Sequence, residues 1–467
     1  MKKFLVIPLF SLLLVSCFED MDDVIQPCST LEIQDFVYKG LNVFYLYKSQ
    51  VPELDDKAFA SQTELNGFLS NYATPEDLFN YLLVEEDRFS FIINDYQKLE
   101  ASLQGVSLHN GMEFGLVQIQ ETGDIFGYVR YVLPQTSAAA NGVKRGMIFN
   151  GIDGQIFNEN NYNGLLSQTT YTINLATLNG SDLTSTGESI TLIKEQYAEN
   201  PVHIQKTFEI DGQKIGYLMY NAFTSSYDNE LNAVFANFKG EGITDLILDL
   251  RYNGGGSIET ANDLSSMITG QFNGQLFIKQ VYNENFPDEE RLFNNKINSG
   301  EMIASLNLNR VYVLTTGSTA SASELILSGL MPYIDVVQIG TTTTGKYQGS
   351  VLIYDSSDFT KKDINLCHRY AMLPLILKSV NSAGFTDYAN GIAPDVELQE
   401  DFSNLGELGQ TDEPLLNAAL NEIIPGFGSG GKPATFPFEF RNLGESGMNS
   451  PLHQRMMVEE IHKDSFK

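Results

Sequence analysis

The sequence predicts a mixed α/β protein built from several domains. The chain has 467 residues, more than one hydrophobic core usually accommodates. Residues 30–104 show the apolar spacing of helices, residues 105–195 are short strand-like segments separated by glycines, and residues 196–425 alternate strands with helices. This order indicates a helical N-terminal domain, a small β domain and an α/β core. Residues 426–467 are predicted to be a glycine-rich linker and a polar tail.

Composition and charge narrow the possible classes of function. Apolar residues make up 42% of the chain and charged residues 19%, which is ordinary for a globular protein and argues against long disordered segments. The formal net charge is −30 at pH 7. A surface of that sign repels nucleic acid and anionic lipid, so we expect no nucleic-acid partner and no adhesion of the fold itself to a membrane.

The N-terminus carries an export signal. Two lysines precede an apolar stretch over residues 4–15, which is too short to span a bilayer as a helix. The stretch ends in Leu-Val-Ser-Cys at Cys17, which resembles the lipobox of bacterial lipoproteins. The resemblance implies that residues 1–16 are removed, and that a lipid on Cys17 and a tether over residues 17–29 hold the fold at the outer membrane, facing the periplasm or the cell surface. The alternative is an ordinary secretory signal with a chance cysteine.

Cysteines and histidines give no sign of a metal site. After removal of the signal, Cys28 and Cys367 are the remaining thiols. Two cysteines so far apart in the sequence do not by themselves predict a disulfide, so whether they pair is left open. The five histidines are scattered without the H-x-x-x-H spacing of metal ligands. We therefore expect no metal and no cysteine nucleophile.

The helical segment over residues 30–104 has clear helix signals. Apolar residues recur at intervals of three and four, and Thr74-Pro75-Glu76-Asp77 supplies an N-cap, a proline at the first helical position and first-turn acids. No catalytic motif occurs there. We predict that this domain carries no chemistry of its own.

The β segment follows a recognisable order. A glycine loop at residues 111–115 precedes a strand over residues 126–132, a short helix over residues 137–143 and a second glycine turn over residues 146–154. This order resembles a PDZ domain, although Met147 replaces the usual aspartate. The resemblance implies that an edge strand accepts a peptide by β-augmentation and that the loop binds the peptide's terminal carboxylate; a small β domain that binds no peptide is the alternative. The residues implied in carboxylate binding are Gly111, Met112, Phe114 and Gly115.

Residues 245–250 form an apolar segment typical of a buried strand, and three glycines follow at residues 254–256. Glycines leave the backbone free to approach a ligand and to point N–H groups at it. The spacing matches neither the P-loop nor the dinucleotide-binding fingerprint. We therefore expect no nucleotide and no other cofactor.

A serine-rich turn follows a second buried strand. The sequence TGSTASASELILSGL begins at Thr316, and its apolar residues change to helical spacing after Ser321. Ser321 and Glu324 form the S-x-x-E pattern of a capping box, so Ser321 is placed where backbone N–H groups and the positive end of the helix dipole would stabilise an oxyanion. The alternative is that Ser321 serves only as an N-cap.

A serine needs a base to become a nucleophile. No histidine has a sequence neighbourhood that recommends it, whereas Lys346 is flanked by glycines, threonines and aromatic residues. Burial would lower the pKa of a lysine from about 10.4 and favour the neutral amine that a base requires. A solvated loop lysine without function is the alternative.

Four motifs together resemble those of the C-terminal processing peptidases, also called tail-specific proteases. In order they are DLRYNGGG at residues 249–256, TASASE at residues 319–324, Gly345-Lys346, and GIAPDV at residues 391–396. Members of that family use a Ser–Lys dyad on a crotonase-like or ClpP-like core with an inserted PDZ domain. The resemblance assigns Ser321 as nucleophile and Lys346 as base.

The same resemblance suggests the remaining site residues. The oxyanion donors would be the backbone N–H groups of Ala322 and of Gly255 or Gly256. Many members carry a glutamine four residues after the lysine, and here that position is Ser350, with Gln348 two residues after the lysine. Either side chain could support the lysine, or the dyad could be weakened.

We therefore expect a serine endopeptidase that cleaves peptides or unfolded proteins recognised near their C-termini. A different class of protein remains open, namely a catalytically inert, PDZ-type surface lipoprotein that only binds peptides. A third hypothesis, a crotonase-like enzyme acting on acyl thioesters, lacks any adenine-binding feature, and the Ser-to-Lys spacing argues against it.

Overall fold

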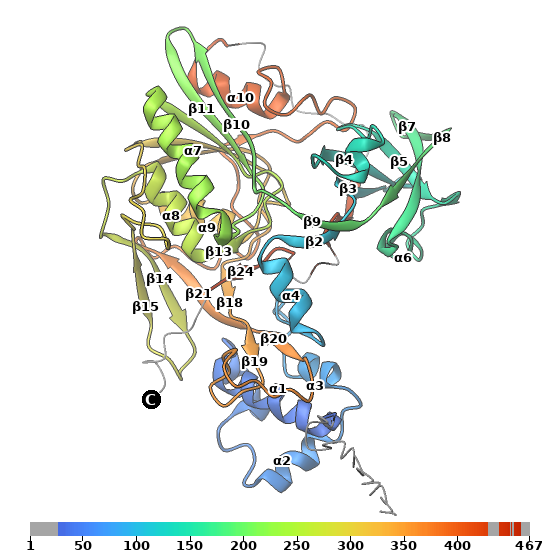
Figure 1. Ribbon diagram of the computed structural model, residues 1–467, viewed down its shortest axis with the longest axis vertical. Helices are drawn as coiled ribbons and strands as arrows, with labels where there is room; N and C mark the ends of the chain where they lie inside the picture. Colours follow the sequence, from blue (N-terminus) through green and yellow to red (C-terminus); the bar gives the residue numbers. More distant parts are fainter. Residues whose placement is uncertain (1–26, 428–438, 449, 451–452, 459–467) are drawn as a thin grey trace, which may run out of the picture.

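The structure is a computed structural model that describes residues 27–427, 439–448, 450 and 453–458. It has the predicted mixed α/β architecture, with a helical N-terminal region at the bottom of Figure 1, an α/β core above it and a β domain beside the core. The predicted signal peptide and Cys17 lie outside the described residues. Within the described ranges, no helix is both long and apolar enough to cross a bilayer.

The N-terminal region begins with helices whose caps match the sequence signals. Thr74 accepts from the backbone N–H of Asp77, and the Asp77 side chain accepts from that of Thr74. The short strand β1 (Phe91–Ile93) pairs antiparallel with β20 (Ala371–Leu373), so this region shares a sheet with the core. The helices are α1 (Thr30–Phe44), η2 (Lys48–Gln50), η3 (Pro52–Leu54), α2 (Gln62–Leu69), α3 (Pro75–Tyr81) and α4 (Tyr96–Leu103).

The main sheet of the core has the strand order β10-β11-β12-β16-β17-β22. The first two strands form a hairpin around Asp211 and Gly212, both with positive φ, as the Asp-Gly turn predicts. The other neighbours are parallel, as expected where helices connect the strands. The strands are β10 (Val202–Ile210), β11 (Gln213–Tyr220), β12 (Asp245–Asp249), β16 (Arg310–Thr315), β17 (Asp335–Gly340) and β22 (Val396–Glu397).

Helices cover both faces of this sheet because its central strands are apolar on both sides. Leu248 and Val313 face one hydrophobic cluster, whereas Ile247 and Leu314 face another. Successive residues of a strand point to opposite faces, which explains the continuous apolar runs in the sequence. The first face is covered by α7 (Asp228–Glu241), α8 (Ile258–Ile268) and α9 (Ala322–Leu330). The second face is covered by α10 (Pro414–Ile423). A short helix, η4 (Ser225–Tyr227), directly precedes α7.

A second sheet lies beside the catalytic motifs and has the order β13-β24-β18-β21-β14-β15. A three-stranded sheet, β1-β20-β19, connects it to the N-terminal region. These strands are β13 (Gly256–Ser257), β14 (Leu276–Tyr282), β15 (Glu289–Leu292), β18 (Gln348–Ser350), β19 (Ile353–Tyr354), β21 (Leu375–Asn381) and β24 (Met456–Met457).

The β domain is inserted between α4 and the core. A two-stranded ribbon, β2 (Val106–His109) with β9 (Glu195–Ala198), connects it to the rest of the chain. Its main sheet has the order β23-β3-β4-β5-β7-β8. The remaining elements are β3 (Met112–Ile119), β4 (Ile125–Val132), α5 (Ser137–Ala140), β5 (Ile148–Ile152), β6 (Gln155–Ile156), α6 (Tyr162–Ser167), β7 (Thr170–Asn179), β8 (Asp182–Ile193) and β23 (Phe440–Glu445).

Two strands come from the segment that the sequence predicts to be a linker and polar tail. β23 adds to the β domain, and β24 adds to the second sheet of the core. The sequence of this segment gives only weak strand signals because β23 and β24 are short and their pairing partners are distant in the sequence. Tertiary pairing, rather than local propensity, forms these strands.

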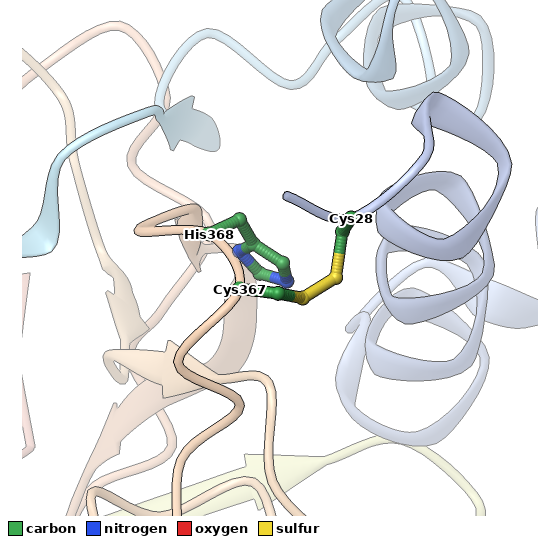
Figure 2. Close-up of side chains that lie close together, drawn as sticks. All are labelled: Cys28, Cys367 and His368. Atoms are coloured by element: carbon green, nitrogen blue, oxygen red, sulfur yellow. A yellow bond between two sulfur atoms is a disulfide. The ribbon is translucent and has the colours of Figure 1, made fainter. Parts of the chain in front are cut away.

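A disulfide joins Cys28 to Cys367, which are 339 positions apart in the sequence. It fixes the segment before α1 to the loop before β20, and His368 lies beside it (Figure 2). These three residues are the one cluster of potential metal ligands found in the described part of the chain. The two sulfur atoms are bonded to each other and therefore offer no thiolate to a metal.

Candidate active site

Ser321 lies in the turn between β16 and α9, and its backbone is strained. Its φ is 66° and its ψ is −116°, a conformation that residues other than glycine rarely adopt. The side chain is fully buried, and its Oγ has no hydrogen-bond partner in the described ranges. Such a turn resembles the strained strand-to-helix elbow that presents a nucleophilic serine in other hydrolases.

Glu324 connects the serine turn to the lysine turn. Its Oε2 accepts from the backbone N–H of Ser321 at 2.7 Å and from that of Lys346 at 2.8 Å. Its Oε1 accepts from the N–H of Gly345 at 2.7 Å and from Thr343 Oγ1 at 2.5 Å. Burial raises the pKa of Glu324, and the hydrogen bonds that it accepts oppose that shift. The predicted helix cap therefore also holds the second catalytic candidate in place.

Gly345 has to be a glycine for the lysine turn to close. Its φ is 88°, and a Cβ at this position would lie 2.3 Å from the carbonyl oxygen of Ala389. Arg88 from the N-terminal region donates from Nη2 to the carbonyls of Gly345 at 3.1 Å and of Ala389 at 3.3 Å. The turn that carries Lys346 is therefore fixed by backbone contacts on both sides.

Lys346 is fully buried, as the desolvation argument requires. Its Nζ has no hydrogen-bond partner among the described residues and lies 4.9 Å from the centre of the Phe89 ring. Burial holds the pKa of Lys346 well below its usual value; Arg455 lowers it further, while Asp87 and Glu324 raise it. The amine is thus neutral at a lower pH than an ordinary lysine, which a general base requires.

The two side chains suggested to support the lysine have other environments in this structure. Gln348 Nε2 donates to Tyr47 Oη at 2.8 Å. Ser350 Oγ is buried without a hydrogen-bond partner in the described part of the chain. Neither one hydrogen-bonds to Lys346 Nζ here, so a supporting role for Gln348 or Ser350 stays a prediction.

The glycine loop lies beside the serine, as the predicted oxyanion hole requires. A Cβ on Gly255 would lie 2.6 Å from Ser321 Cβ, and a Cβ on Gly256 would lie 2.2 Å from the carbonyl oxygen of Phe223. The N–H of Gly255 donates to Asn253 Oδ1 at 2.8 Å and is engaged. The N–H groups of Gly256 and of Ala322, the first residue of α9, are the other two candidates, and their role stays a prediction.

The N-terminal region contributes to the site, which the sequence did not reveal. The Phe89 ring packs against the Lys346 amine, and the charge of Asp87 raises the pKa of Lys346. More than 250 residues separate them from the lysine in the sequence, and no local motif marks them. The N-terminal region therefore lines the lysine pocket. That it carries no chemistry of its own stays a prediction.

A buried ionic network lies at the end of β12, directly before the glycine loop. Arg251 is fully buried and donates from Nε to Asp249 Oδ1 at 3.0 Å and from both terminal nitrogens to Glu413 at 2.6 and 2.9 Å. Glu413 also caps α10 by accepting from the N–H of Leu416 at 2.8 Å. The strand before the glycine loop is thus locked to the helix on the second face of the sheet.

The same network extends into the β domain. Arg145 donates to Glu400 Oε1 at 2.8 Å and to Tyr252 Oη at 2.8 Å. Arg130 donates from Nη2 to Ser318 Oγ at 3.0 Å, and its guanidinium lies 4.7 Å from the centre of the Tyr252 ring. The β domain therefore contacts both the glycine loop and the turn that carries Ser321.

The residues implied in carboxylate binding lie at the beginning of β3. The N–H of Gly111 donates to His109 Nδ1 at 2.7 Å, and that of Met112 donates to Asn110 Oδ1 at 3.0 Å. β23 occupies the edge of β3 beside the other two residues. The predicted edge strand therefore already has a partner from this chain, and carboxylate binding by the loop stays a prediction.

Comparisons with known proteins agree with these motifs. The profile of "Peptidase family S41" matches residues 214–398, and that of "Peptidase S41 N-terminal domain" matches residues 32–91. Together these matches cover more than half of the chain. They include the serine turn, the lysine turn and the segment that packs against Lys346.

Two curated relatives are carboxyl-terminal-processing proteases of cyanobacteria. That of Picosynechococcus sp. (strain ATCC 27264 / PCC 7002 / PR-6) is 27% identical over 169 residues, covering 36% of this chain and 37% of the relative. That of Synechocystis sp. (strain ATCC 27184 / PCC 6803 / Kazusa) is 22% identical over 258 residues, covering 54% of each protein. This chain therefore spans about a third to a half of the length of these relatives.

Solved structures share the fold over most of the chain. A candidate S41 protease from Bacteroides fragilis NCTC 9343 has a TM-score of 0.64 and 25% identity, covering 83% of this chain and 96% of that one. The photosystem II D1 C-terminal processing protease has a TM-score of 0.52 and 18% identity, covering 83% of this chain and 98% of that one, and this likeness shows the fold alone. The S41 profile contains the Ser321 and Lys346 turns, and the N-terminal-domain profile contains the segment that packs against Lys346. The chain belongs to peptidase family S41.

Proposed function

We propose that this chain is a serine endopeptidase of the C-terminal processing type, with Ser321 as nucleophile and Lys346 as general base. The observation that carries the proposal is the arrangement around Glu324, which binds the backbone N–H groups of both residues. A strained, buried serine and a desolvated lysine are thereby held in adjacent turns. Family membership supports the same reaction.

The proposed reaction is acyl transfer to the serine. Ser321 Oγ attacks the scissile carbonyl while Lys346 Nζ takes its proton and then passes it to the leaving amine. The N–H groups of Ala322 and Gly256 would stabilise the tetrahedral oxyanion. Lys346 Nζ has no hydrogen-bond partner among the described groups and does not hydrogen-bond to Ser321 Oγ in this structure.

We propose peptides or unfolded proteins, recognised near their C-termini, as substrates. The β domain supports this because β3 accepts a strand along its edge, which is the geometry of β-augmentation. The contacts of Arg130 and Arg145 with the catalytic loops connect such binding to the active site. The names of the cyanobacterial relatives are consistent with this class of substrate.

We also propose that the protein is exported as a lipoprotein anchored through Cys17. The Leu-Val-Ser-Cys motif supports a lipid anchor, and the Cys28–Cys367 disulfide supports an oxidising compartment outside the cytoplasm. Incorporation of labelled palmitate by the wild type and not by Cys17→Ala would support the anchor. Equal labelling of both proteins, or of neither, would contradict it.

The dyad is tested by cleavage of a reduced, carboxymethylated globular protein, which is a permanently unfolded substrate. Ser321→Ala and Lys346→Arg should each reduce cleavage by about 10²-fold or more, because one lacks the nucleophile and the other keeps the positive charge but cannot act as a base. Lys39→Arg, on an exposed lysine of α1, is the matched control. Cleavage retained by either dyad variant would contradict the assignment.

The inert, peptide-binding alternative has one observation in its favour: Ser321 Oγ and Lys346 Nζ do not hydrogen-bond to each other in this structure. A fluorophosphonate probe separates the two hypotheses because it reacts with activated serines. Labelling of the wild type that is lost in Ser321→Ala would exclude the inert protein. A wild type that binds peptide, resists the probe and leaves the unfolded substrate intact would support it.

A further inference from the structure

The C-terminal segment of this chain lies along the edge of the β domain as a bound peptide would. β23 pairs antiparallel with β3, from Phe440 opposite Ile119 to Glu445 opposite Gly115. Just beyond the strand, Ser446 donates its N–H to the carbonyl of Phe114 at 2.9 Å, and the Ser446 side-chain Oγ accepts from the N–H of Phe114 at 3.1 Å. The segment thus occupies the edge that peptide binding by β-augmentation would use.

Contacts of Glu445 connect this bound segment to the catalytic turn. The Glu445 carboxylate accepts hydrogen bonds from Arg130 of β4 and from Ser318, three positions before the nucleophile. His453 Nε2 lies 3.3 Å from the other carboxylate oxygen. The segment is therefore held at the junction between the β domain and the active site.

Further along the chain, β24 lies between β13 and β18 of the second sheet. β24 pairs parallel with β13, so that Met456 lies opposite Gly256 of the glycine loop, and it also pairs parallel with β18, so that Met457 lies opposite Ser350. β24 therefore lies between β13, which begins at Gly256 of the predicted oxyanion hole, and β18, which follows Lys346. Peptide substrates commonly bind proteases in such an extended conformation, pairing with strands of the enzyme.

One peptide carbonyl of the segment lies next to the nucleophile. The carbonyl oxygen of Arg455 and Ser321 Oγ lie 2.7 and 2.9 Å from the same point, the position that a Cβ on Gly255 would take. The next peptide bond, between Arg455 and Met456, begins the paired strand. The Arg455 carbonyl therefore lies beside both the serine and the glycine loop.

The side chains on either side of this bond pack against neighbouring residues of the site. The Arg455 guanidinium lies 4.8 Å from the centre of the Phe91 ring. After the bond, Met456, Met457 and Val458 are buried in the hydrophobic clusters around the cleft. The positive charge of Arg455 also lowers the pKa of Lys346, so the segment favours the neutral form of the base.

We propose that this chain is its own substrate and that Ser321 cleaves it in cis between Arg455 and Met456. The inference rests on the proposed peptidase function and goes beyond it by assigning a cleavage site within the chain. The product is a chain that ends at Arg455 and a peptide of residues 456–467. Removal of that peptide leaves the space between β13 and β18 open for the extended strand of another substrate.

The chemistry balances without any co-reactant except water. Ser321 Oγ bonds to the carbonyl carbon of Arg455 while its proton passes to Lys346 Nζ. The bond from that carbon to the nitrogen of Met456 then breaks, and Lys346 returns the proton to that nitrogen. Water, activated by Lys346, hydrolyses the ester and restores the serine hydroxyl. A carboxylate on Arg455 and an amine on Met456 result.

The test follows the C-terminus of the full-length chain. The protein is made by cell-free translation with a labelled amino acid, and its intact mass is followed with time for wild type, Ser321→Ala and Lys346→Arg. The wild type should lose residues 456–467, while the dyad variants should keep them. The half-time should not change when the protein is diluted, because both partners of an intramolecular reaction belong to one molecule.

Variants at the cleaved bond provide a second readout. Met456→Pro removes the N–H of the leaving nitrogen and places a ring there, and should keep the chain intact. Lys39→Arg, on an exposed lysine of α1 outside the bound segment, should be cleaved as the wild type is. Loss of residues 456–467 from Ser321→Ala, or a rate proportional to protein concentration, would overturn cleavage in cis by this serine.

Cleavage of the carboxymethylated unfolded protein is measured in the same samples. A wild type that cuts this substrate but retains Lys467 would overturn self-cleavage and leave the proposed peptidase function standing. A wild type that cuts neither would overturn both. Loss of residues 456–467 together with cleavage of the added substrate is the result that we expect.

Discussion

The backbone N–H groups of Ser321 and Lys346 donate to the same carboxylate oxygen, Glu324 Oε2, at 2.7 and 2.8 Å. Side chains on two separate turns are thus placed by one shared acceptor on the first turn of α9. A nucleophile and its base have to be held within fractions of an ångström to react, and a shared anchor couples their positions. Glu324 acts through these two residues and is therefore a positioning residue.

Glu324→Gln should lower both stability and catalysis. The amide has one oxygen instead of two, so at least one buried backbone donor loses its acceptor, at a cost of about 1–3 kcal/mol. We expect a lower urea midpoint and a kcat reduced more strongly than KM is changed. Glu397→Gln, on an exposed carboxylate of β22, is the control and should change neither quantity. An unchanged kcat in Glu324→Gln would contradict the positioning role.

The rate of acylation should rise with pH through an unusually low lysine pKa. Only the neutral amine accepts a proton, and it predominates above the pKa of Lys346, which burial holds well below its usual value. The fluorophosphonate labelling rate of Ser321 should therefore rise and reach a plateau below the ordinary lysine pKa of about 10.4. Lys346→Arg should be labelled slowly at every pH. A rise centred at or above the ordinary lysine value would contradict a desolvated base.

Arg251→Met should destabilise the fold strongly. The guanidinium is fully buried and neutralises Asp249 and Glu413, so its removal leaves buried carboxylates without a partner, at a cost of about 3–5 kcal/mol. Arg310→Met removes an exposed ion pair with Asp335 and should cost no more than about 1 kcal/mol. Denaturant unfolding measures both variants. Similar midpoints for the two would contradict the structural role of the buried network.

Loss of the disulfide should destabilise the protein. The bond between Cys28 and Cys367 closes a loop of more than 300 residues, and removing such a constraint from the unfolded chain typically costs about 2–5 kcal/mol. The double variant Cys28→Ala, Cys367→Ala should show a lower Tm than the wild type under non-reducing conditions. Reductant should lower the Tm of the wild type only. If reductant lowered the Tm of both proteins equally, the disulfide would not contribute to stability.

Phe91 should favour a basic residue before the cleaved bond. Its ring lies 4.8 Å from the Arg455 guanidinium, and a cation–π contact of this kind is worth about 0.5–1 kcal/mol. Phe91→Ala should therefore lower kcat/KM about two- to fivefold for peptides with arginine at that position. Peptides with leucine there are the matched control and should be affected less. A uniform loss for both peptides would indicate a structural role of Phe91 instead.

Elements with local signals could be predicted from the sequence. Apolar periodicity predicted the parallel strands and their helices, the Thr74 cap and the Asp-Gly turn were visible as short motifs, and the S-x-x-E spacing around Ser321 predicted the contact of Glu324 with the serine N–H. These features depend on residues within a few positions of one another. They could therefore be read without knowledge of the fold.

The surroundings of the candidate dyad depend on contacts between distant parts of the chain. Phe89 and Asp87 reach Lys346 because β1 pairs with a strand near the far end of the core, and Arg455 reaches Ser321 because the tail is drawn into the sheet between β13 and β18. Such contacts join residues hundreds of positions apart, and a long-range pairing leaves no periodic or spacing signal in either segment. The desolvation that makes Lys346 a base is a property of that assembled environment, so the sequence could suggest the lysine but not its pKa.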